Sequence, residues 1–88
     1  MFISNTSHEE IQQLHKTIST NIKTHRMAKN ISQLELALTI GMKSAAFLGN
    51  EENNTNDKHF NIEHIYKISK ALDIPIETLI LDSTPDKV

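Results

Sequence analysis

The chain has 88 residues, which is enough for one domain and too few for two. It contains no cysteine, so neither a disulfide bond nor a thiolate metal site can stabilise it. No stretch approaches the roughly 20 apolar residues that span a membrane, and Met1-Phe2-Ile3 is too short for a signal-peptide core. We therefore expect a soluble, cytoplasmic protein with one modest core.

The charge is distributed unevenly along the chain. The net charge of −2 argues mildly against nucleic acid as a partner. Residues 1–50, however, hold five Lys/Arg and three Asp/Glu, whereas residues 51–88 hold four Lys/Arg and eight Asp/Glu. Binding to DNA depends on the local field more than on total charge, so the basic first half is expected to be the half that faces DNA.

A capping box predicts where the first helix begins. Ser7 stands three residues before Glu10, which is the spacing of that motif. The apolar residues that follow recur at steps of three and four, which predicts one stripe on a helix over 8–29. The members of this stripe are Ile11, Leu14, Ile18 and Ile22.

Two short helices are predicted next, with a glycine between them. Ser32 and Glu35 form a second capping box and predict a helix over 33–40. Gly41 can take a positive φ and end that helix. The segment 43–52 can form a third helix.

The remainder of the chain predicts a polar loop and two further helices. Residues 53–58 are rich in asparagine and are expected to form a flexible loop. Asn61 is a candidate cap for a fourth helix, and Pro75 suits the first turn of a short fifth helix. The expected apolar faces of these two helices are Ile62, Ile65, Ile68 and Leu72, and then Ile76, Leu79 and Ile80. The expected fold class is all-α, with a domain at 8–82 between flexible ends at 1–7 and 83–88.

Five short helices with a glycine between the second and third resemble the Cro and lambda-repressor (XRE) family of helix-turn-helix proteins. The residues that carry the resemblance are Arg26, Ile31-Ser32-Gln33, Leu36-Ala37, Gly41-Met42, Phe47 or Leu48, Glu51 or Glu52 with Asn53, Ile65, Ile68, Ala71-Leu72 and the run 74–79. The resemblance implies a five-helix DNA-binding domain, with a helix-turn-helix motif at about 33–52 whose second helix lies in the major groove. The implied function is a transcription regulator, most simply a repressor.

The resemblance also implies which residues contact the DNA backbone. Gln33 stands at the start of the second helix, where backbone N–H groups and the helix dipole favour a phosphate. Lys43 precedes the third helix and can neutralise another phosphate. Lys58 and His59 follow it, where the chain would run beside the sugar-phosphate backbone. Contacts of this kind position a protein on DNA without reading sequence.

Base reading is then expected from the third helix and its start. The residues concerned are Ser44, Ala45, Ala46, Gly49 and Asn50. Asparagine pairs bidentately with adenine and alanine packs on the thymine methyl, so A·T-rich half-sites are expected. A single small module buries too little surface for specific binding, which predicts a homodimer. Its expected dimer surface is the apolar end of the chain, at Ile76, Leu79, Ile80 and Leu81.

Alternatives remain for several of these features. Leu34 and Leu38 are four residues apart and form either extra core, which we favour, or a protein contact surface. A protein-interaction module on the same fold, such as an antitoxin, antirepressor or adaptor, is the second functional hypothesis. One of Glu51 and Glu52 is expected to act as a cap or to pair with Arg26, while the other points to solvent. Neither a nucleophile-base pair nor a third ligand beside His59 and His64 is evident, so no enzyme, metal or cofactor is expected.

Overall fold

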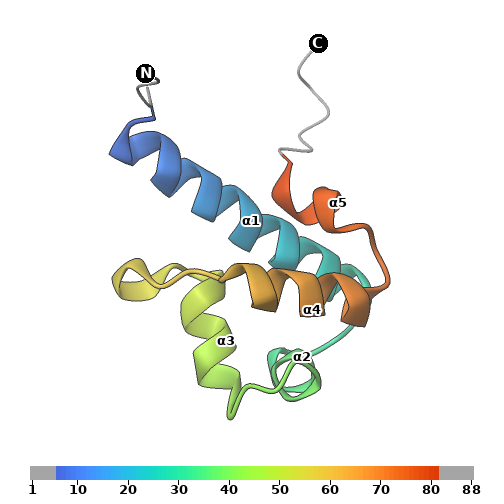
Figure 1. The fold of residues 1–88 in the computed structure, drawn as a ribbon. Helices are drawn as coiled ribbons and strands as arrows, with labels where there is room; N and C mark the ends of the chain where they lie inside the picture. Colours follow the sequence, from blue (N-terminus) through green and yellow to red (C-terminus); the bar gives the residue numbers. More distant parts are fainter. Residues whose placement is uncertain (1–5, 82–88) are drawn as a thin grey trace.

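A computed structural model describes residues 6–81 as one long helix followed by shorter ones (Figure 1). The elements are α1 (His8–Ala28), α2 (Gln33–Thr39), α3 (Ala45–Glu52), the 3₁₀ turn η1 (Thr55–Asp57), α4 (Ile62–Leu72) and α5 (Ile76–Ile80). The predicted all-α class and the five helices are confirmed. The expected flexible ends lie, apart from residues 6 and 7, outside the described part of the chain. Within that part, no helix is both long and apolar enough to cross a membrane.

Local caps set the starts of α1 and α2 as predicted. The Ser7 hydroxyl accepts from the Glu10 N–H and the Glu10 carboxylate accepts from the Ser7 N–H, at 3.1 and 2.8 Å. The same reciprocal pair joins Ser32 and Glu35 at 3.0 and 2.9 Å. α3 begins two residues later than predicted, because Ser44 is extended and serves as its N-cap.

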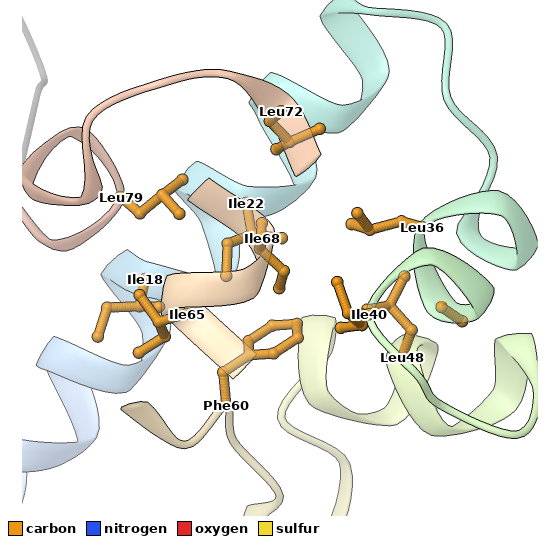
Figure 2. Packing of buried hydrophobic residues seen from close by; sticks show 11 residues of the cluster. Ile18, Ile22, Leu36, Ile40, Leu48, Phe60, Ile65, Ile68, Leu72 and Leu79 are labelled. Carbon is orange, nitrogen blue, oxygen red and sulfur yellow. The ribbon is translucent and has the colours of Figure 1, made fainter. Parts of the chain in front are cut away.

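One apolar core is shared by all five helices and the segment before α4 (Figure 2). Its buried members are Ile18, Ile22, Leu36, Ala37, Ile40, Leu48, Phe60, Ile65, Ile68, Leu72 and Leu79. Buried Asn21 of α1 fastens α5 to this core, because its Nδ2 donates to the carbonyl oxygens of Leu79 and Leu81 at 3.0 and 2.9 Å. The core thus holds the α2–α3 pair against a platform of α1, α4 and α5.

The structure corrects the expected environment of several apolar side chains. Ile11 and Leu14 are each 42% exposed, because the first turns of α1 project away from α2 (Figure 1). Ile62 is 69% exposed. It is the first residue of α4, and its Cα–Cβ bond tilts toward the N-terminal end of the helix. Leu34 and Leu38 are also exposed, so the favoured assignment of this pair to the core is wrong.

Candidate nucleic-acid interface

A tight turn joins α2 to α3 and fixes the angle between them. Gly41 has φ +89°, in the region that L side chains rarely adopt, and the Met42 N–H donates to the Ala37 carbonyl oxygen at 2.8 Å. Leu36 of α2 and Leu48 of α3 are buried together in the core (Figure 2). The predicted role of Gly41, a turn with positive φ between two helices, is confirmed.

The outward face of α3 presents small, polar and aromatic side chains. Ala46 is exposed, and Asn50, four residues later on the same face, is partly exposed. Ser44 and Ala45 are also partly exposed, and the Ser44 hydroxyl makes no capping hydrogen bond. Lys43 is exposed in the turn before the helix. The structure thus brings the predicted base-reading residues at 44–46 and 50 to one end and one face of α3.

Phe47 lies at the surface of α3 and was missing from the predicted site. The sequence left open whether Phe47 or Leu48 fills the core, and the structure buries Leu48 completely while Phe47 is 52% exposed. A half-exposed phenyl ring on this face can pack on a thymine methyl group. Its exposure follows from helix geometry: once Leu48 enters the core, the preceding residue points about 100° away.

A buried ion pair fastens α3 to α1. Arg26 Nε and Nη2 donate to Glu52 Oε2 and Oε1 at 2.8 and 3.2 Å, and Arg26 Nη1 donates to the Ile31 carbonyl oxygen at 2.8 Å. The Glu52 side chain has no exposure and that of Arg26 has 9%. This two-bond geometry suits a guanidinium and holds both charges away from water. The expected pairing of Arg26 with one of the two glutamates is confirmed for Glu52.

Gln33 and Gly49 contact each other inside the α2–α3 junction. Gln33 Nε2 donates to Glu52 Oε1 at 3.1 Å, which joins α2 to the ion pair. A Cβ added to Gly49 would lie 3.3 Å from Gln33 Oε1, so this glycine allows the amide to lie close against α3. Both residues, predicted to contact DNA, therefore also have a structural role in holding the two helices together.

Neither glutamate at the end of α3 adds a free negative charge to the outward face. Glu52 is enclosed by Arg26, as described above. Glu51 does not point to solvent as expected: its side chain is 17% exposed and its Oε1 lies 3.4 Å from His64 Nδ1. Burial raises the pKa of Glu51, and the nearby His64 opposes that shift. Carboxylates that would repel phosphate are thus turned toward the protein.

The loop after α3 is ordered around one asparagine. Asn54 has φ +53°, and its Nδ2 lies within hydrogen-bond distance of Ser19 Oγ, the Glu51 carbonyl oxygen and the Lys58 carbonyl oxygen, at 3.0, 3.2 and 3.0 Å. Asparagine tolerates this left-handed conformation better than most residues. The loop thereby holds exposed Lys58 beyond one end of α3, while Lys43 precedes the other end.

Replacing Asn54 should separate the contribution of its side-chain amide from that of its left-handed backbone conformation. Glycine at this position keeps the positive φ but removes the amide, and we expect a loss of about 1–2 kcal/mol in the free energy of unfolding. Alanine also strains the backbone and should cost about 1 kcal/mol more. Urea unfolding followed by circular dichroism measures both. Exposed Asn53 provides the control, and equal stability of its alanine variant and Asn54→Ala would contradict the assignment.

His59 stacks on a histidine of α1. The rings of His15 and His59 have centroids 3.7 Å apart and are inclined by 13°. Burial and the neighbouring His59 lower the pKa of His15 below its ordinary value of 6.5. The His59 ring, predicted to approach DNA, is therefore packed against α1. No group of three His, Asp or Glu side chains within residues 6–81 is arranged to hold a metal ion.

The lowered pKa of His15 predicts that acid destabilises the fold. His15 binds its proton more tightly in the unfolded chain than in the folded one. Its contribution to the free energy of unfolding is therefore present above about pH 6.5 and is lost as the pH falls below that value. Glu51 acts with the opposite sign, because its raised pKa favours folding as the carboxyl becomes protonated. We expect the melting temperature of the native chain to fall more between pH 7.5 and 5.5 than that of His15→Phe. An equal fall in both would contradict this.

Comparison with known families agrees with the geometry. The helix-turn-helix family model matches residues 22–79, which is more than half of the chain and runs from the second half of α1 into α5. No curated protein matches the sequence. The matched range contains the buried Arg26–Glu52 pair, the turn at Gly41 and all of α3. The chain therefore belongs to the helix-turn-helix family of DNA-binding regulators, of the Cro and lambda-repressor type.

Proposed function

We propose that this protein is a sequence-specific regulator of transcription that binds double-stranded DNA as a homodimer and acts as a repressor. α3 enters the major groove, with Lys43 and Lys58 on phosphates at its two ends. The observation that carries the proposal is the outward face of α3, where Ala46, Phe47 and Asn50 lie together and no carboxylate points outward. A regulator bound at a promoter represses by excluding other proteins from the same DNA.

The chemistry of this face favours A·T-rich half-sites. Ala46 and Phe47 offer apolar contact to thymine methyl groups, and Asn50 can pair with the N6 and N7 edge of adenine. Side chains as small as Ala45 and Ala46 also let the helix backbone approach the base edges, so DNA shape contributes to selection. Gln33 retains one amide hydrogen beyond its bond to Glu52 and can donate it to a phosphate.

The dimer surface proposed from the sequence needs revision. Leu79 is fully buried in the core and is not available to a second copy. Leu81 is 61% exposed, Ile80 is partly exposed, and Leu14 of α1 shares a shallow hollow with Ile80. We therefore place the contact between copies on Leu14, Ile80 and Leu81, with Ile11 at its edge.

Selection of binding sites from a random pool of duplex DNA tests the function. We expect paired A·T-rich half-sites, a mass on DNA of two chains by light scattering, and affinity that falls steeply with salt. Lys43→Ala should weaken binding to all sequences alike and lower the salt dependence by about one counterion. Failure to enrich any sequence at low salt would reject DNA recognition. A G·C-rich consensus would reject the proposed contacts of the outward face of α3 with A·T base pairs.

A further inference from the structure

An apolar groove runs between the C-terminal end of α2 and α4, apart from the outward face of α3. It has a volume of about 540 Å³ and is lined by Leu38, Thr39, Ile40, Gly41, Tyr66, Lys67, Lys70 and Ala71. Leu38 and Tyr66 are 59% and 54% exposed, although both are large apolar or aromatic side chains. Leu34, one turn before Leu38 on α2, is 50% exposed and extends the apolar surface.

The charged residues that line this groove are both lysines. Among its eight lining residues there are two lysines and no acidic residue, although the chain as a whole has a net charge of −2. Lys70 Nζ lies 5.3 Å from the centre of the Tyr66 ring. Lys67 Nζ contacts Glu63 at 2.8 Å in a pair whose side chains are 46% and 69% exposed. Such an exposed pair is weak, so Lys67 remains able to take another carboxylate.

We propose that this groove is a docking site for an acidic, apolar segment of another protein. The apolar side chains of the segment lie on Leu38, Ala71 and the Tyr66 ring, and its carboxylates reach Lys67 and Lys70. An amphipathic helix that lays its apolar face into a groove is a common form of such recognition. The positive rim selects against basic segments and steers acidic ones.

A second copy of this chain does not suit the groove. A two-fold contact would bring Lys67 and Lys70 of one copy toward the same lysines of the other, which repel each other. A contact with a different face of a second copy would be heterologous and would produce a ring or a filament, not the two-fold dimer proposed above. DNA is also a poor occupant, because Leu38, Ile40 and Ala71 offer no hydrogen bonds to phosphate.

The groove and the proposed DNA face are separate parts of the surface. None of Ala46, Phe47 and Asn50 lines the groove, so a segment can occupy it while α3 is engaged elsewhere. The docking proposal therefore does not depend on DNA recognition, and each can fail alone. If both hold, the protein links a DNA site to an acidic partner.

The test is selection of peptides by the full-length protein from a random library of 16-residue peptides displayed on phage. We expect a consensus that alternates apolar residues with Asp or Glu. The selected peptide, labelled with fluorescein, should lose at least ten-fold in affinity for Leu38→Glu and for Lys70→Glu. The matched controls are Met27→Glu and Lys16→Glu on α1, which place the same new charge at exposed apolar and basic positions that do not line the groove and should bind as the native chain does.

Three results would overturn the proposal. The first is a selection that yields no consensus or a basic one. The second is a loss of DNA affinity in Lys67→Ala and Lys70→Ala as large as in Lys43→Ala, which would assign these lysines to DNA. The third is conversion of a dimer to a monomer by Leu38→Glu in sedimentation experiments, which would assign the groove to a second copy. Circular dichroism confirms that each variant is folded, as expected for exposed positions.

Discussion

Replacing Glu52 with glutamine is expected to lower the free energy of unfolding by about 3–5 kcal/mol. The change removes one charge and almost no volume, so it leaves the Arg26 guanidinium buried without its counter-charge. It also disturbs the bond from Gln33, which shares the same carboxylate oxygen. A domain of 88 residues has a total stability of roughly 4–13 kcal/mol, so this loss is a large fraction of the total.

Two controls separate the ion pair from a general effect of charge. Glu51→Gln makes the same exchange one residue earlier, where burial already raises the pKa of the carboxyl, and we expect little loss of stability. The double variant Arg26→Met with Glu52→Leu replaces both charges by apolar groups and should recover most of the loss. Urea unfolding measures all four proteins. A Glu52→Gln variant within 1 kcal/mol of the native chain would contradict the assigned role.

Placing a carboxylate on the outward face of α3 should abolish specific DNA binding. We expect Ala46→Glu to weaken binding to the selected duplex by about 100-fold or more, because the new charge faces phosphates and the new bulk separates the helix from the bases. The fold should survive, since Ala46 is exposed and glutamate favours helices.

Thr20→Glu is the matched control for this variant. It adds the same charge to an exposed position of α1, away from α3. Fluorescence anisotropy with the selected duplex should give nearly the native affinity for Thr20→Glu. A similar loss in both variants would show that Ala46→Glu acts through total charge, and a native affinity for Ala46→Glu would remove α3 from the interface.

Features fixed by neighbours in sequence were predictable. The helix predicted over 8–29 is found at His8–Ala28, and that over 33–40 at Gln33–Thr39, because each begins at a capping box whose two partners are only three positions apart. Gly41 ends the second segment for an equally local reason, its positive φ. The helix-turn-helix arrangement follows from these local signals and from the burial of Leu36 and Leu48 in one core.

Features set by distant parts of the chain were not predictable from periodicity. Ile11 and Ile18 belong to one stripe, yet only Ile18 is buried, so the pattern alone cannot show where the core ends. Phe47 and Leu48 are adjacent and both apolar, and only the angle of α3 decides which is buried. The contact of Gln33 with Gly49 likewise depends on how closely α2 and α3 approach, and a glycine inside a helix was its only signal.

Photo-crosslinking from α3 tests the central claim most directly. p-Benzoylphenylalanine in place of Phe47 keeps an exposed aromatic side chain on the outward face, and the same residue in place of Tyr66 puts one on α4. On irradiation with the selected duplex, we predict crosslinks to major-groove atoms of thymine from position 47 and none from position 66. Crosslinks from position 66 alone, or equally from both, would contradict the account.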